Sequence, residues 1–206
     1  MNKRVLSSAV GAVVLLSASV FAQVSVQPGI TAGLSSYSET ESIPGISVTT
    51  DSKMGLVAGG VLDIVIMKMF SIEPAVVYSM RGGQVSDAGV TAKLNLSYLA
   101  IPVHFKLKYP VTPIVSPYAL AGVNVGILLS AKADDGTTSQ DVKDSMNTTD
   151  FGIDLGAGVE FSASSVVPFV EIVYDIGLSN LAKDAPADVS AKTSGMEIKA
   201  GLRFKM

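Results

Sequence analysis

The stretch Phe151-Gly-Ile-Asp-Leu-Gly-Ala-Gly-Val-Glu-Phe161 decides the fold. Every odd position in it is apolar, and every even position is glycine or a carboxylate, Asp154 or Glu160. Successive side chains of a strand point to opposite faces, so this segment has one apolar face and one polar or empty face. The same alternation returns over residues 196–204. No helical period fits either segment, and both are predicted to be strands.

This alternation predicts eight strands, each near or above the roughly 9 to 11 residues with which a tilted strand crosses a bilayer. We expect them at 25–36, 53–66, 69–81, 92–108, 114–131, 150–162, 166–179 and 193–204. Long polar loops (37–52, 82–91, 132–149 and 180–192) alternate with tight turns (near 67–68, 109–113 and 163–166). This pattern is typical of outer-membrane barrels with both termini in the periplasm and the long loops outside. The predicted fold class is all-β: an eight-stranded antiparallel up-and-down transmembrane β-barrel after a cleaved signal peptide.

The N-terminus has the features of a secretory signal. Lys3 and Arg4 precede an apolar stretch at 5–21, and Val20-Phe21-Ala22 ends in a small residue that signal peptidase accepts. A transmembrane anchor is the alternative, but serines interrupt the stretch and it falls short of the roughly 20 apolar residues that a spanning helix needs. We therefore expect residues 1–22 to be a signal peptide and residues 23–206 to form an outer-membrane β-barrel domain.

Composition narrows the function classes. The 206 residues are 48% hydrophobic and 16% charged, against roughly 25% charged residues in an average soluble domain. The absence of cysteine excludes disulfides, thiolate zinc sites and cysteine nucleophiles, and a single histidine is present. The net charge is −3, and no basic cluster occurs beyond the extreme N-terminus. Nucleic acid is therefore not an expected partner, because neutralising phosphates requires concentrated lysine and arginine.

The alternation also assigns faces to the predicted strands. In the third strand the even positions from Phe70 to Met80 face lipid, and Ser71, Glu73, Ala75, Ser79 and Arg81 face the lumen. In the seventh strand Val170, Ile172, Tyr174, Ile176 and Leu178 point outward, while Glu171 and Asp175 point inward. The fourth strand changes phase between Tyr98 and Ile101, which predicts a β-bulge near Leu99. Prolines at 28, 74, 102 and 168 conflict with central strands, because proline cannot donate to the ladder.

Charged residues gather at the inward positions. The acids are Asp63, Glu73, Asp154, Glu160, Glu171, Asp175 and Glu197, and the bases are Lys93, His104, Lys106, Lys199 and Arg203, with Arg81 near a rim. An eight-stranded barrel has room inside only for side chains, so these charges are expected to pair as a buried network. The alternative is a proton path or a ligand site, for which the luminal glycines Gly122, Gly126, Gly156 and Gly158 would leave room.

Neither catalysis nor a cofactor is expected, and we assign no catalytic, cofactor-binding or metal-binding residue. His104 falls near the periplasmic end of its strand, whereas lipid-modifying barrels keep their active groups near the outer leaflet, and nothing fixes a nucleophile beside it. The third long loop carries Asp134, Asp135, Asp141 and Asp144, with Asp150 after it, and suggests calcium. It lacks the ligand spacing of an EF-hand, so a solvated loop is the favoured interpretation.

The chain resembles the PorT-like outer-membrane β-barrel family over most of its length after residue 22. The residues that carry the resemblance are Gly29-Ile-Thr-Ala-Gly33-Leu34, Glu73-Pro74 with Tyr78 and Arg81-Gly82, Tyr98-Leu-Ala-Ile101-Pro102-Val103, Pro117-Tyr118-Ala-Leu-Ala-Gly122, Phe151-Gly152 to Gly156-Ala-Gly158-Val-Glu160, and Tyr174-Asp-Ile-Gly177-Leu178-Ser-Asn180. The resemblance implies an eight-stranded outer-membrane barrel. The family is broad, so the secretion role of its namesake does not transfer with membership.

Two features depart from the family pattern. Such barrels usually end on an aromatic residue that the assembly machinery reads, whereas Phe204 is followed here by Lys205 and Met206. The chain has no tryptophan, so the interfacial aromatic girdles must be thin. They are expected to consist of Phe70, Tyr78, Tyr98, Phe105, Tyr109, Phe161, Tyr174 and Phe204.

Two functions fit these features. The first is a non-enzymatic outer-membrane protein of a Gram-negative cell envelope, with a structural or surface-interaction role and an envelope or secretion assembly as its candidate setting. The second is a small-ligand transporter or sensor that uses the luminal charges. The expected partners are outer-membrane lipids, the barrel-assembly machinery and envelope proteins.

Overall fold

The computed structural model describes residues 24–87, 90–162, 164–183, 186 and 189–206. The predicted signal peptide at 1–22 lies outside the described residues. Within them, no helix has the length and apolar character needed to cross a membrane.

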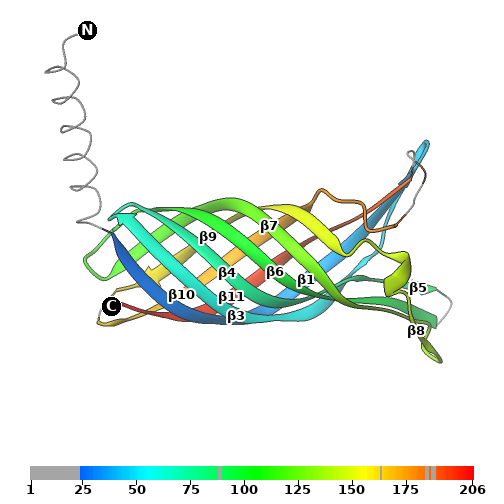
Figure 1. Ribbon diagram of the computed structural model, residues 1–206, viewed down its shortest axis with the longest axis horizontal. Coiled ribbons are helices and arrows are strands. Elements are labelled where there is room, and N and C mark those ends of the chain that lie inside the picture. The colour runs from blue at the N-terminus through cyan, green and yellow to red at the C-terminus, as the bar shows by residue number, and fades with distance from the viewer. Residues whose placement is uncertain (1–23, 88–89, 163, 184–185, 187–188) are drawn as a thin grey trace, which may run out of the picture.

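Eight long antiparallel strands form a closed ring (Figure 1). In ring order they are β1 (Ser25–Ile43), β3 (Asp51–Met67), β4 (Phe70–Arg81), β6 (Val90–Lys108), β7 (Val115–Asp134), β9 (Thr149–Phe161), β10 (Val166–Gly177) and β11 (Ser190–Phe204). Closure is made by β1, which pairs with β3 on one side and with β11 on the other. The predicted eight-stranded up-and-down barrel is confirmed, because each ring strand coincides with one predicted segment.

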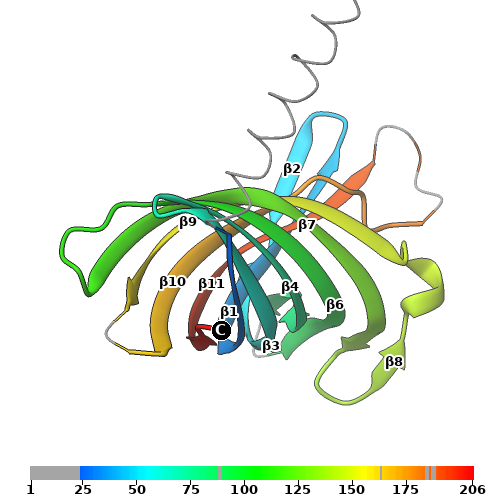
Figure 2. The same ribbon diagram turned by 60° about the vertical axis from the view of Figure 1, so that its left-hand side comes forward.

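The predicted long loops contain further secondary structure. β1 and β7 run beyond their expected ends, and they pair with the short strands β2 (Ile46–Thr49) and β8 (Ser139–Asp141). β5 (Gly83–Asp87) pairs with β3 and β6, and a 3-10 turn, η1 (Lys143–Ser145), follows β8. Figure 2 shows β2 and β8 projecting beyond the ring. The loops are therefore partly rigid extensions of the barrel wall.

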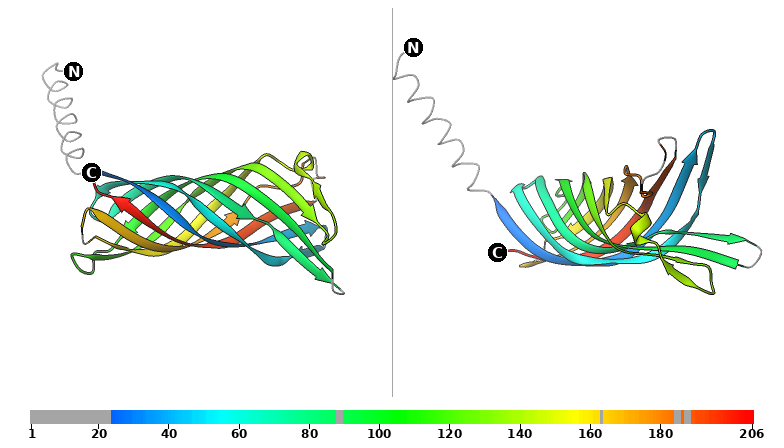
Figure 3. Two further views of the ribbon diagram at one scale, coloured as in Figure 1. Left: turned by 90° about the horizontal axis from the view of Figure 1, so that it is seen from below. Right: turned by 45° about the vertical axis from the view of Figure 1, so that its right-hand side comes forward.

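The two ends of the barrel differ. One end, here called the turn end, carries the short connections after β3, β6 and β9, together with the start of β1 and the C-terminus (Figure 1). The opposite end, the loop end, carries β2, β5 and β8 (Figure 3). This distribution confirms the predicted alternation of short and long connections.

The outer surface carries an apolar belt. The predicted lipid-facing side chains of β4 and β10 point outward, while Glu73, Glu171 and Asp175 are buried inside. The same holds around the ring for large exposed apolar residues, among them Ile30, Leu34, Leu56, Val76, Ile101, Val103, Phe105, Val123, Phe151, Leu155, Ile172 and Ile198. On β1 the outward residues change to Ser36, Ser38 and Thr40 toward the loop end, so the belt ends near Ser36.

The bulge lies on a different strand from the one predicted. β6 keeps one alternation from Leu96 to Lys108, with even positions buried throughout. The register slips instead on β7, where Leu128 pairs with Tyr98 and Ser130 pairs with Ser97, so Leu129 is the extra residue. The prediction near Leu99 was wrong because the side chains of Leu96 and Tyr98 point into the lumen and not toward lipid.

Leu96 and Tyr98 instead close the lumen at the loop end. They pack with Leu128, Ala131 and Leu181 in a buried apolar cluster. Tyr98 is fully buried and does not belong to the outer aromatic girdle, contrary to expectation. Above the belt, an apolar side chain therefore no longer indicates the lipid face.

The prolines are accommodated within the ring. Pro28, Pro74, Pro102 and Pro168 all lie inside strands. The ladder between β4 and β6 is interrupted between the Pro74–Val103 and Val77–Ala100 pairs, which is where Pro102 lies. The expected conflict thus appears as a local gap in pairing, and the strand continues through it.

Candidate functional site

The charged side chains of the lumen are buried, as predicted. Asp63, Glu73, Asp154, Glu160, Glu171, Asp175, Glu197, His104, Lys106, Lys199 and Arg203 all lie inside the barrel with little or no exposed surface. Their positions follow from the strand alternation, which turns every second side chain of each ring strand inward. They form the candidate functional site, here called the luminal network.

Two basic residues differ from the prediction. Lys93 is exposed, because β6 has no change of phase near Leu99 and its odd positions point outward. Arg81 was expected near a rim but is only 2% exposed and belongs to the network. Sequence reasoning also missed Lys108 and Asp150, both buried. Their parity, shared with Lys106 and Asp154 respectively, was the signal that could have found them.

At the turn end, two cations link acids from three other strands, so that five strands are connected. The Lys108 ammonium lies 2.6 Å from Asp63 Oδ2 and 2.9 Å from Glu160 Oε2. Arg203 lies 2.9 Å from the same Glu160 oxygen and 2.7 Å from Glu73 Oε2. Glu160 therefore joins the two cations, and Arg203 carries the connection up to Glu73 in the middle of the lumen.

In the middle of the barrel, two lysines continue the chain of ion pairs. Lys106 Nζ donates to Glu73 Oε1 at 2.6 Å and to Glu171 Oε2 at 3.1 Å. Lys199 lies 3.4 Å from Glu171 and 3.2 Å from Glu197. Since these residues come from β4, β6, β10 and β11, the pairs connect opposite walls of the barrel.

Toward the loop end, one arginine serves two aspartates. Arg81 lies 3.1 Å from Asp150 and 3.1 Å from Asp175. The Tyr37 hydroxyl donates to Asp175 at 3.2 Å or to Glu197 at 3.1 Å, which links this group to the middle of the lumen. The network thus extends from Asp63 near one end to Asp150 near the other.

Aromatic rings fill the remaining space, and they lie over glycines. The Arg203 guanidinium stacks 3.9 Å from the centre of the Phe169 ring, and Lys106 lies 4.7 Å from that of Tyr118. A Cβ at Gly201 would come within 2.5 Å of the Phe169 ring, and one at Gly158 within 2.5 Å of Tyr118. Gly158, one of the predicted luminal glycines, and Gly201 therefore make room for rings, whereas Gly156 faces the backbone of Ile172 and Val173.

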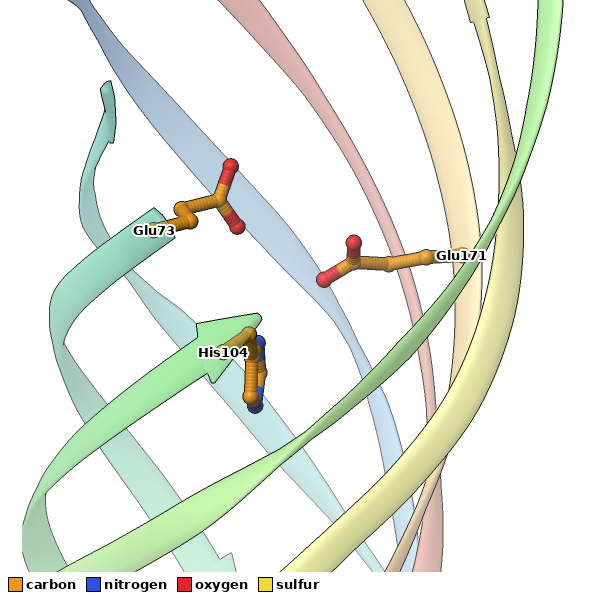
Figure 4. Close-up of side chains that lie close together, drawn as sticks. All are labelled: Glu73, His104 and Glu171. Carbon is orange, nitrogen blue, oxygen red and sulfur yellow. The ribbon is translucent and has the colours of Figure 1, made fainter. Parts of the chain in front are cut away.

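Three luminal side chains converge closely enough to be considered as a metal site. Figure 4 shows Glu73 from β4, His104 from β6 and Glu171 from β10 in the lumen, and their potential ligand atoms lie within 4.8 Å of one another. However, the Lys106 ammonium already donates to both carboxylates. A fixed cation between the two acids does not fit a metal centre, because the ion and the ammonium would repel each other.

His104 does not form a catalytic arrangement in the described part of the chain. Its Nε2 lies 2.8 Å from Asp154 Oδ2, and its Nδ1 has no hydrogen-bond partner among the described residues. A Ser-His-acid triad requires a hydroxyl on the second ring nitrogen. The geometry is that of a buried His–Asp pair.

The carboxylates of the third long loop bond within their own turns. Asp135 accepts from the backbone and hydroxyl groups of Thr137 and Thr138, and these bonds hold its pKa well below its usual value. Asp141 accepts from the backbone of Lys143, and Asp150 leaves the loop to pair with Arg81. These hydrogen bonds close the turns of the loop, and the solvated loop stays a prediction.

A closed antiparallel barrel with an apolar belt and a polar interior defines the class of outer-membrane β-barrels. The chain belongs to the family described as "Outer membrane protein beta-barrel domain", whose model matches residues 21–183. This match confirms the outer-membrane barrel family and places the protein in the outer membrane. No curated protein matches the chain.

The chain is similar to several solved outer-membrane proteins. Neisserial surface protein A (NspA) is 16% identical, with a TM-score of 0.51 over 87% of this chain and 97% of that one. Ail, the attachment invasion locus protein of Yersinia pestis, is 17% identical, with a TM-score of 0.45 over 86% of this chain and 98% of that one. OprG from Pseudomonas aeruginosa is 12% identical, with a TM-score of 0.47 over 89% and 97%. At 16% identity the likeness to NspA shows the fold alone.

Proposed function

We propose that this protein is a non-enzymatic outer-membrane barrel with a structural or surface-interaction role. The observation that carries the proposal is the filled lumen, in which ion pairs and aromatic rings connect opposite walls between Asp63 and Asp150. A lumen of this kind acts as a core. A partner protein would instead contact the extensions at the loop end, where β2, β5 and β8 present rigid backbone beyond the apolar belt.

We further propose the topology and delivery that this role needs. Cleavage after Ala22 would release the barrel domain, the turn end would face the periplasm, and the loop end would lie outside the cell. An envelope or secretion assembly of the PorT-like kind is the proposed setting. The support is the sequence of the N-terminus, the short connections at the turn end, and the resemblance to that family.

An epitope inserted at the tip of the β1–β2 hairpin tests the topology. Gly45 lies at this tip with φ +82°, and nothing lies within 4 Å of the position that a Cβ would occupy, so an insertion there disturbs no packing. We expect an antibody to label intact cells. An epitope that is labelled only after the outer membrane is permeabilised would show that the orientation is wrong.

The second candidate function is a transporter or sensor, favoured by one observation. Asp150, Asp154 and Asp175 each have one buried carboxylate oxygen without a hydrogen-bond partner among the described residues. The Nδ1 atom of His104 likewise has none among them. These groups could receive a small polar ligand or a proton. They lie on the loop-end side of Glu171, where the described acids outnumber the bases.

Separate substitution of Glu171 and Lys199 distinguishes the two functions. A structural network predicts that Glu171→Gln and Lys199→Met lower the temperature at which the barrel loses its gel mobility in sodium dodecyl sulfate. It also predicts that vesicles containing the wild-type barrel do not leak small solutes. A wild-type barrel that passes solutes, with the variants folded normally but altered in flux, would support the transporter instead.

A further inference from the structure

A cavity at the loop end lies outside the luminal network. It has a volume of about 400 Å³ and is lined by residues of β1, β5, β6 and β7 with their connecting segments. Four of its lining residues are acids, Glu39, Glu41, Asp134 and Asp135, and Lys93 is its one base among the described residues. A volume of this order lies within the range of small-molecule sites. The cavity therefore has the size of a ligand site and a net negative lining.

Glu39 is the unusual member of this cavity. It is 6% exposed, and its Oε1 has no hydrogen-bond partner among the described residues. It forms none of the ion pairs that occupy the luminal carboxylates. Its backbone is fixed, since its N–H donates to the Thr50 hydroxyl at 2.9 Å and its carbonyl accepts from the Thr50 N–H at 2.8 Å. A buried, fixed carboxylate without a cation is costly unless a partner supplies the charge.

The positions of the acids in the cavity indicate the shape of a cationic ligand that would fit it. The sheet order runs β1, β3, β5, β6, β7 at this end, so Glu39 and Glu41 lie on one wall while Asp134 lies on another. Val85, Leu94 and other apolar residues lie between them. Among the described residues, the cavity brings no three acidic groups close enough to share one metal ion. An extended cation with charges at both ends and an apolar middle matches this lining.

We propose that the loop-end cavity binds a small aliphatic diamine, with one ammonium group on Glu39 and Glu41 and the other on Asp134. The methylene chain would lie on the apolar wall between them. Amines of this class pair with carboxylates through charge-assisted hydrogen bonds, which are the stronger ones. The site is separate from the structural role of the luminal network, so either proposal can fail without the other.

The binding has a specific pH dependence. Glu39 lies beyond the apolar belt, where burial and the neighbouring Glu41 raise its pKa to about 7, although Lys53 on β3 lowers it in part. Tyr98 also faces it from β6, and Lys93 lines the same cavity. A bound ammonium favours the ionised carboxylate, so binding releases a proton when Glu39 starts protonated. Affinity therefore rises as the pH increases through 7.

Calorimetry of the full chain in non-ionic detergent micelles tests the site. The probe is 1,4-diaminobutane, and 1,4-butanediol is its neutral analogue. From pH 6 to pH 8, a group with a pKa of about 7 changes from about one-tenth to about nine-tenths ionised, so we expect the affinity to rise about tenfold. Glu39→Gln should weaken binding at pH 8 at least tenfold and remove the pH dependence.

The matched control is Asp144→Asn, an exposed loop acid that does not line the cavity. It removes the same formal charge and should leave binding unchanged. The heat-dependent gel shift of each variant shows that the barrel has folded. Equal binding by the diol, unchanged binding by the Glu39→Gln variant, or displacement of the diamine by low calcium concentrations would each overturn the proposal.

Discussion

Replacing Lys106 by Met would remove the cation at the centre of the luminal network. Its side chain is completely buried, and its Nζ lies 2.6 Å from Glu73 and 3.1 Å from Glu171. It also faces the Tyr118 ring at 4.7 Å. Met has a similar length and fits the same space, so the change isolates the charge from the packing.

The expected loss of unfolding free energy depends on which cations Glu73 and Glu171 still have after the substitution. Removing one partner of a buried ion pair costs about 3–5 kcal/mol, because the other charge stays buried and uncompensated. Here Glu73 retains Arg203 at 2.7 Å and Glu171 retains Lys199 at 3.4 Å. We therefore expect the lower end of that range, about 3 kcal/mol, which is roughly a hundredfold in the unfolding equilibrium.

Urea unfolding in lipid vesicles measures this loss. The chain lacks tryptophan, so far-ultraviolet circular dichroism and the heat-dependent gel shift replace tryptophan fluorescence as readouts. The control is Lys132→Met, at an exposed lysine of β7, which should change the free energy of unfolding by no more than about 0.5 kcal/mol. A Lys106→Met barrel as stable as this control would refute the argument that the luminal charges hold the walls together.

Three further predictions address the belt, the rings and the loop end. Val76→Lys puts a charge on the lipid face of β4 and should destabilise the barrel by about 2–4 kcal/mol in the same urea titration. Its control is Val85→Lys on β5, beyond the belt, which should cost almost nothing. The two valines are equally exposed, Val76 at 51% and Val85 at 52%. Gly201→Ala should cost about 1–3 kcal/mol because its Cβ would meet the Phe169 ring, which a lower unfolding midpoint would reveal. The free energy of unfolding should fall by up to about 3 kcal/mol between pH 4.5 and 7. Glu39 keeps its proton up to a pKa of about 7 in the folded barrel, whereas the unfolded chain loses it near 4.5. Glu39→Gln should make the free energy of unfolding nearly constant over this pH range.

Strand positions and luminal charges could be predicted because both follow from a period of two. The segment from Phe151 to Phe161 shows the reasoning: its odd residues point outward, and Asp154 and Glu160 are buried. The alternation holds wherever one face meets lipid and the other meets charge. It determines which residues point inward, but it gives no distance between strands that are far apart in the sequence.

The errors arose where the environment changes along a strand. Leu96 and Tyr98 are apolar yet luminal, because the loop end of the lumen is closed by an apolar cluster. Lys93 would point inward only if β6 changed phase near Leu99, and without that change its odd position points outward. In both cases the neighbouring strands and loops, and not the local sequence pattern, determine which way the side chain points. The diamine cavity could not be predicted either, since Glu39 and Asp134 meet only through the pairing of β3, β5 and β6.

Buried ion pairs contribute little net stability compared with apolar packing of the same volume, so the extent of the luminal network calls for another advantage. We infer that the luminal charges fix the register in which neighbouring strands pair. A slip of β11 by one residue against β10 would turn Lys199 and Arg203 outward into the apolar belt, at about 2–4 kcal/mol for each charge near the bilayer centre. The same slip would take one of two cations from each of Glu171 and Glu160 inside the lumen. Wrong registers are therefore penalised on both faces at once. The charges add little to the correct barrel compared with apolar packing of the same volume, but they exclude its nearest competitors.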